Sequence, residues 1–278
     1  MHDPNLPSFD KPPLVEVALT VQFEPLAKLS SPYMGLLWSK FRNRFPKVEE
    51  ARPIVSVIER LGVPEASKSQ RQLLEPPMAP RIWFVDESDR ELIQIQNNRF
   101  SRNWRKPGSF DQHQYPRYES HIRPKFQEDL NEFCRFLSDE ALGDLKPNQC
   151  EITYVNHILA GQGWRQHSEF GSVFRVWDKR FNKNPGLEIE NITLGFTTLL
   201  CDQNGEFIGR LHVTIRPGFR RDDDEPLFSL ELTARGRPFQ DNIDGVFAFL
   251  DFGRSHIVKT FEAITTEEMH KIWGKVHV

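Results

Sequence analysis

The sequence predicts an α+β fold in which an antiparallel sheet is covered on one face by two long helices. Runs of predicted strands precede two long amphipathic segments, at 118–137 and 247–264, and helices that follow runs of strands collect on one side of a sheet. In addition, an eight-residue strand pattern at 16–23 recurs 135 positions later, at 151–158. We therefore expect two related halves.

The chain has 278 residues, which suits one large domain or two closely packed ones. Residues 1–13 carry four prolines and predict an extended lead-in. The first half then spans 14–145 and the second 146–278, in one compact unit. Two arrangements fit: a saddle like that of the TATA-binding protein, or a curved sheet that grips a helix.

Composition and charge exclude several classes of protein. The 36 basic and 39 acidic residues leave a net charge of −3, which argues against a chain built mainly to coat nucleic acid or an anionic membrane. No stretch approaches the 18 apolar residues of a membrane span, whereas 22 Phe and 6 Trp can form a core. The three cysteines fit free thiols in a reducing compartment. We expect a cytoplasmic protein with no membrane association.

The first half opens with a half-buried strand, because apolar and polar residues alternate from Glu16 to Phe23. Ser30 can cap a helix over 32–45, with a proline in the first turn. The run 54–61 predicts another strand, and 62–80 predicts a loop.

A hairpin and a long helix complete the first half. Strands at 81–85 and 91–97 are joined by a polar turn over 86–90. Apolar residues at steps of three or four then predict a helix over 118–137 that is kinked or restarted at Pro124.

The second half repeats this order. After the strand at 151–158, three more strands are expected near 193–201, 207–216 and 227–235, the first two joined through Asn204-Gly205. A helix over 247–264 follows. A capping box with Thr265 as the cap and Glu268 as its partner predicts a short last helix.

The segment 94–106 combines basic, amide and aromatic side chains and contains no acid. Single-stranded nucleic acid is bound by this combination, because arginines contact phosphates while rings stack on bases. The alternative is a strand that runs into a loop and packs on the neighbouring helix, which the overall charge favours. The binding candidates here are Arg99, Arg102, Asn103, Trp104 and Arg105, continued by Tyr115, Arg117 and Tyr118.

Two further groups of polar residues lie on predicted strands. Arg210, His212 and Arg216 share one face, which is either solvated or a platform for an anionic or peptide ligand. Asn156 and His157 lie on the strand that begins at Glu151. His157 shares a face with Glu151 and could act as a general base, although such a histidine is more often structural.

Motifs for cofactors and metals are missing from the sequence. It has no glycine-rich phosphate loop, no nucleophile elbow and no spaced His/Cys ligands. We expect no cofactor and no metal, and the enzyme hypothesis becomes weaker.

Several motifs together resemble a sporadically distributed bacterial family of uncharacterised proteins of about this length. They lie in the order 9–23, 96–105, 115–118, 148–157 and 256–273, and nearly span the chain. The resemblance implies no particular activity and no catalytic residues. The patchy distribution of the family implies horizontally moved genes, and hence a defence or mobile-element setting.

Three functions follow as hypotheses. The first is a non-enzymatic binding or regulatory protein with a protein partner. The second is a nucleic-acid-binding module that uses the arginine-aromatic segment and the 210–216 strand, and the third is a hydrolase around His157. The sequence leaves the oligomeric state open.

Overall fold

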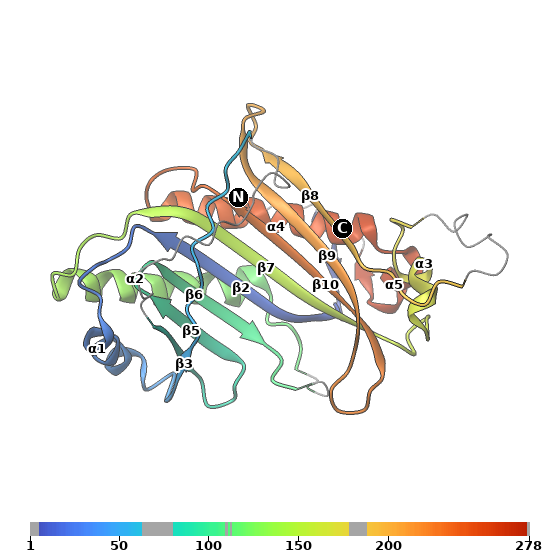
Figure 1. Ribbon diagram of the computed structural model, residues 1–278, viewed down its shortest axis with the longest axis horizontal. Helices are drawn as coiled ribbons and strands as arrows, with labels where there is room; N and C mark the ends of the chain where they lie inside the picture. Colours follow the sequence, from blue (N-terminus) through green and yellow to red (C-terminus); the bar gives the residue numbers. More distant parts are fainter. Residues whose placement is uncertain (1–5, 63–79, 109–110, 112, 178–187, 277–278) are drawn as a thin grey trace.

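The computed structural model describes residues 6–62, 80–108, 111, 113–177 and 188–276. Within these residues, nine strands form one antiparallel sheet in the order β3-β4-β5-β6-β2-β7-β10-β9-β8, and β1 pairs with β11 (Figure 1). The strands are β1 Ser8–Phe9, β2 Leu14–Phe23, β3 Lys47–Ala51, β4 Arg81–Val85, β5 Glu91–Gln96, β6 Arg99–Arg105, β7 Pro147–Leu159, β8 Leu194–Cys201, β9 Phe207–Phe219, β10 Pro226–Gly236 and β11 Lys275–Val276. The helices are α1 Ser31–Phe41, η2 Tyr118–Ile122, α2 Arg123–Asp139, η3 His167–Glu169, α3 Phe170–Val173, α4 Ile243–Ile264 and α5 Glu267–Ile272.

The two longest helices of the described residues lie behind the sheet in Figure 1. Helix α4 contacts β7 and β10, and α2 contacts β6. We call the opposite side of the sheet the open face. The α+β class expected from the sequence is confirmed. Among the described residues, no helix is both long and apolar enough to cross a membrane.

Aromatic rings fill the space between the helices and the sheet. Phe133 of α2 stacks on Phe100 of β6 with ring centroids 5.1 Å apart, and Phe126 contacts Phe247 of α4 at 5.7 Å. At Gly253, a side chain would come within 3.0 Å of Ile152 and Ala234, so the glycine lets α4 approach the sheet closely. The expected core positions are confirmed as buried: Phe126, Leu130, Phe133, Leu250, Ile257 and Phe261.

Local patterns predicted most element positions, including the hairpin turn at 86–90 and the strand pair around Asn204-Gly205. The helix expected over 118–137 begins as one π-helical turn, η2, and continues as α2 from Arg123, directly before Pro124. The last cap lies one residue later than expected: Thr266, rather than Thr265, accepts the N–H of Met269.

The strand expected at 54–61 is wrong. These residues belong to no strand of the sheet, although they are extended, and they cross the open face from the β3 side to β9. In Figure 1 this light-blue segment runs in front of the sheet, across the direction of the strands. Side chains of the sheet satisfy part of its backbone, so a strand-like pattern does not require strand pairing here.

Candidate functional site

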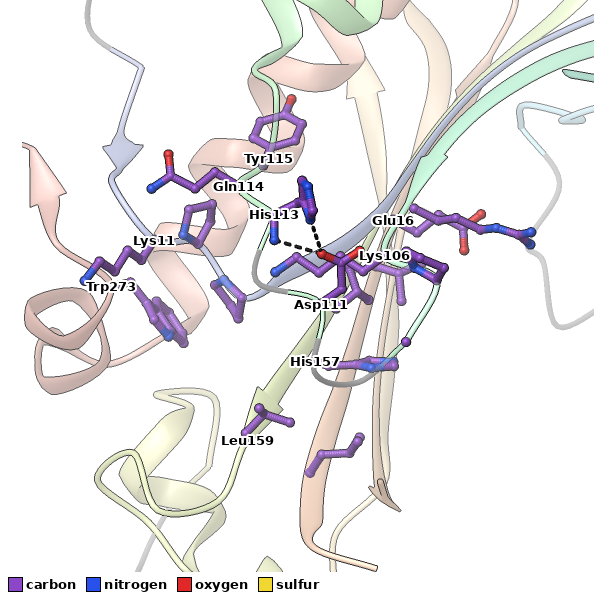
Figure 2. Close-up of a pocket in the computed structure, with 18 of the residues that line it drawn as sticks. Lys11, Glu16, Lys106, Asp111, His113, Gln114, Tyr115, His157, Leu159 and Trp273 are labelled. Atoms are coloured by element: carbon purple, nitrogen blue, oxygen red, sulfur yellow. Dashed lines mark hydrogen bonds and ion pairs between the residues drawn. The ribbon is translucent and has the colours of Figure 1, made fainter. Parts of the chain in front are cut away.

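A pocket of about 630 Å³ opens beside the N-terminal end of β2 (Figure 2). The lead-in at 10–16, the chain leaving β6 at 105–108, the end of β7 and Trp273 form its walls. These segments lie far apart in the sequence and meet only in the folded chain. We call this space the pocket.

An acidic group anchors one wall of the pocket. Asp111 accepts the backbone N–H of His113 at 2.8 Å, lies 2.6 Å from His113 Nδ1 and pairs with Arg90 at 3.1 Å. Burial acts to raise the pKa of Asp111, but these hydrogen bonds and the Arg90 charge lower it overall. The carboxylate is therefore satisfied by its own chain and holds this wall in place.

Lys106 is the half-buried lysine of the pocket. Its side chain is half-buried, and burial lowers its pKa although the nearby Asp111 acts in the opposite direction. Its ammonium group forms no hydrogen bond or ion pair with the described part of the chain, although Figure 2 shows it beside Asp111. An ammonium group with three free donors can receive an anionic group.

His157 lines the same pocket from β7, as expected for a residue on the open face. Burial lowers the pKa of its ring, which favours neutral imidazole. The expected pairing with Glu151 is wrong. The two residues lie six positions apart on one strand, about 20 Å, and Glu151 instead binds Arg235.

The hydrolase hypothesis around His157 depends on which groups lie near its ring. The described lining of the pocket includes no serine, threonine or cysteine that His157 could activate. Within the described ranges, no three His, Cys, Asp or Glu side chains are grouped so that they could hold a metal ion.

The arginine-aromatic segment does not form one surface. As strand β6, it directs Phe100, Arg102 and Trp104 to the helix face and alternate residues to the open face. Arg102 is buried and pairs with Asp129 of α2 and Glu91 of β5. The binding hypothesis for this segment requires exposed arginines that converge, and the buried Arg99 and Arg102 do not meet this requirement.

The remaining residues of this segment are buried or bind their own chain. Arg99 is buried on the open face, and Arg105 donates from Nε to the Asp89 carbonyl at 2.9 Å while its other side lines the pocket. Asn103 donates to Glu16 at 2.6 Å and accepts from Gln94 at 2.8 Å. Trp104 is buried in contact with Tyr115, with ring centroids 5.6 Å apart.

A second cavity, of about 430 Å³, lies on the helix side and collects most of the other candidates. Tyr115 is hydrogen-bonded to Tyr154 at 3.0 Å, and burial raises its pKa. Arg117 donates to the Phe9 carbonyl at 3.0 Å, and Asn156 donates to the Leu230 carbonyl at 3.3 Å. Tyr118 lies outside this lining and donates to Asp251 at 2.7 Å. All of these polar groups have partners inside the fold.

The strap, which we define as residues 54–60, binds the open face at the other end of β2. Gln96 accepts the N–H of Ile54 at 3.0 Å and donates to its carbonyl at 3.1 Å. Gln22 accepts the N–H of Val57 at 3.2 Å and donates to its carbonyl at 3.0 Å. The N–H of Glu59 donates to Gln149 at 3.0 Å.

The three glutamines lie on one cross-strand row. Gln96 is opposite Arg99, Arg99 is opposite Gln22, and Gln22 is opposite Gln149 in the strand register. Sequence reasoning missed this row, because each glutamine by itself is an ordinary polar residue of a strand. Only the register of four strands aligns them.

The strap ends in a cluster of cations. The Glu59 carboxylate pairs with Arg210, lies 2.9 Å from His212 Nε2 and 3.4 Å from Arg235. Burial acts to raise the pKa of Glu59, but hydrogen bonds from His212 and Arg210 and the Arg235 charge lower it to about 2. Arg210 and His212 therefore lie together, as the sequence predicts, and bind their own chain. Arg216 lies farther along β9 and is exposed.

When the chain is compared with protein-family models, curated proteins and solved structures, none of them matches it.

Proposed function

We propose that the chain is a non-enzymatic binding protein that receives an anionic side chain of a protein partner in the pocket. The observation that carries the proposal is Lys106, a half-buried cation without a hydrogen bond to the described residues, facing a pocket that His157 also lines. A charge-assisted hydrogen bond in such a partly desolvated position is stronger than one at an open surface.

Two features favour a protein partner over nucleic acid. The arginines of β6 do not form a phosphate-binding surface, because Arg99 and Arg102 are buried. The pocket places one half-buried lysine beside the carboxylates of Glu16 and Asp111, which suits a single anionic group better than a polyphosphate backbone. A defence or mobile-element setting rests on the family resemblance alone.

The proposal also includes the duplication of the two halves. Each half runs from a central strand, β2 or β7, through outer strands back to its neighbour, β6 or β10, and then into a long helix. Glu16 lies opposite Arg105 on β6, and Glu151 lies opposite Arg235 on β10. One rotation that superposes 14–138 on 149–262 and brings Glu16 onto Glu151 supports the duplication. If no such rotation exists, the two halves are unrelated.

The binding proposal is tested with a phage-displayed library of random peptides, panned against the wild-type chain. We expect selected peptides to share an acidic residue and to lose binding to the Lys106→Gln variant. The matched control is Lys40→Gln, which removes an exposed lysine of α1 and should bind as the wild type does.

Equal binding of the selected peptides by Lys106→Gln, or selection without acidic residues, contradicts the proposal. A labelled single-stranded DNA oligomer tests the alternative in parallel. Binding whose log affinity falls linearly with log salt, and that is unchanged in Lys106→Gln, would support nucleic acid instead.

A further inference from the structure

We infer that the open face carries a second binding site, separate from the pocket, for an extended peptide with an acidic side chain, and that the strap occupies this site within its own chain. The ligand class is a segment of a partner protein that presents a glutamate or aspartate where the strap presents Glu59. The inference does not depend on the pocket. The pocket lies at the N-terminal end of β2, and the glutamine row lies at its C-terminal end.

The first argument is how the backbone of the strap is bound. Gln96 and Gln22 each pair with both the N–H and the carbonyl of one strap residue, Ile54 and Val57. Because every amino acid except proline offers the same two groups, this contact does not depend on side-chain identity. Backbone pairing of this kind supplies affinity when proteins bind extended peptides.

The second argument is the specificity for an acid. The Glu59 side chain is only 1% exposed and lies among Arg210, His212 and Arg235. Arg210 also donates to the carbonyl of Arg60 at 3.0 Å, so the same guanidinium binds the carboxylate and the backbone that follows it. Glu151 shares Arg235 and compensates part of this positive charge. A neutral side chain here would leave the buried arginine without its carboxylate.

The third argument is that the strap is held with little burial of its apolar side chains. Val55, Val57 and Ile58 are 53%, 37% and 46% exposed. Its attachment depends mainly on backbone hydrogen bonds and one carboxylate, with one further hydrogen bond that Asn98 donates to the Ser56 hydroxyl at 2.8 Å. Another peptide with the same two features can make the same contacts.

The fourth argument comes from connectivity. β3 and β4 are antiparallel neighbours, with Ala51 opposite Arg81, and a tight turn could join them. Instead, residues 52–80 intervene, and their described part crosses the sheet as far as β9. Connections this long within a compact domain are usually functional.

Because the strap occupies the site, it competes with any peptide from a partner protein. A tethered segment acts at a local concentration that reaches the millimolar range for short flexible links. A partner segment must displace the strap in order to bind. Weakening the binding of the strap should therefore raise the apparent affinity of the site for such a peptide.

The test uses a fluorescein-labelled peptide with the sequence of residues 53–61, Pro-Ile-Val-Ser-Val-Ile-Glu-Arg-Leu, and its binding is followed by fluorescence anisotropy. We expect Glu59→Gln to bind this peptide about tenfold or more tightly than the wild type does, because its own strap competes less well. The same peptide with glutamine in place of its glutamate should not bind. Adding Arg210→Gln to Glu59→Gln should abolish binding.

Two controls distinguish this site from the pocket and from a general effect of surface charge. Glu49→Gln, at an exposed acid of β3, should leave peptide binding at the wild-type level. Lys106→Gln in the Glu59→Gln background should not change binding of the strap peptide, so that failure of the pocket proposal and failure of this one are distinguishable. Equal affinity of wild type and Glu59→Gln overturns the inference, as does stable dimerisation of Glu59→Gln by exchange of straps.

Hydrogen exchange of the wild-type chain keeps the inference testable if Glu59→Gln does not fold. The N–H groups of Val57 and Glu59 should exchange through a local opening with a smaller free energy than the N–H groups of β2 and β7. If they exchange only on global unfolding, the strap is a fixed part of the fold and the inference is wrong.

Discussion

Glu59 of the strap and Arg210 of β9 form a buried ion pair across 151 positions of the sequence. Both side chains are almost fully buried, and His212 and Arg235 complete the environment of the carboxylate. Burying both charges costs free energy that their attraction must offset, so the pair by itself is weak evidence for net stability. Here the pair determines where an otherwise unpaired segment lies on the sheet.

The Glu59 contact predicts a stability difference that depends on pH. The folded-state pKa of Glu59, about 2, lies below the ordinary value of 4.5. The group therefore stabilises the fold above about pH 4.5, and this contribution is lost as the pH falls from 4.5 toward 2. It amounts to at most about 3 kcal/mol. Urea unfolding of the wild type and Glu59→Gln at pH 6 and pH 3 should show a difference that shrinks at pH 3. A constant difference contradicts the prediction.

Arg102 and Arg105 should differ strongly in their effects on stability. Arg102→Ala removes one of the two arginines that pair with Asp129, a carboxylate with no exposed surface, and leaves only Arg44 to compensate it. The loss should be about 3 kcal/mol. Arg105→Ala removes one hydrogen bond to the carbonyl of Asp89 from a half-buried side chain and should cost about 1 kcal/mol. Urea denaturation of both variants measures this contrast. Similar losses would show that Arg102 is not essential to the buried network.

Phe261 should be among the side chains whose truncation is most costly. Its ring lies 5.1 Å from Trp273 and 5.4 Å from Phe9, so it joins α4 to α5 and the lead-in. Phe261→Ala should lower the free energy of unfolding by about 3–5 kcal/mol. Phe219→Ala, at a ring that is 61% exposed, is the control and should cost less than about 1 kcal/mol. A loss below about 1 kcal/mol for Phe261→Ala would show that the ring does not belong to the core.

The three thiols should differ in reactivity. Burial raises the pKa of Cys150 well above its usual range and that of Cys134 to about 11, whereas Cys201 is exposed. Ellman's reagent at pH 8 should therefore react rapidly with one thiol of the native chain and with the other two after unfolding. Cys201→Ser should remove the rapid phase. Persistence of that phase in Cys201→Ser would contradict the assignment.

Much of the secondary structure could be read from short-range patterns. The alternation at Val17, Leu19 and Val21 predicts β2, and the helical spacing of Phe126, Leu130 and Phe133 predicts α2, because the burial of each residue follows the period of its own element. The same reasoning placed His157 on the face of Glu151 and brought Arg210 close to His212. These relations extend over a few residues or across one pair of strands.

The environment of Arg102 shows that short-range patterns do not reveal the ion-pair partner of a buried charge. It lies between Phe100 and Trp104 in the alternation of β6, which places it on the buried face. Whether an arginine is tolerated there depends on Asp129 and Glu91, which come from α2 and β5. The sequence interpretation treated Arg102 as part of a binding surface, because the charge of a residue does not reveal its partner.

The strap likewise depends on contacts that local sequence patterns do not reveal, here for a whole segment instead of one side chain. By itself, the sequence determined the α+β class, most element boundaries and the extended character of 54–60, since all of these follow from local periodicity. Tertiary structure alone decided that these residues bind glutamine side chains instead of pairing in the sheet, and that Glu59 meets Arg210. The physical reason is that both outcomes depend on the register of strands that lie far apart in the sequence. Contacts so distant in sequence form only when the whole sheet has assembled.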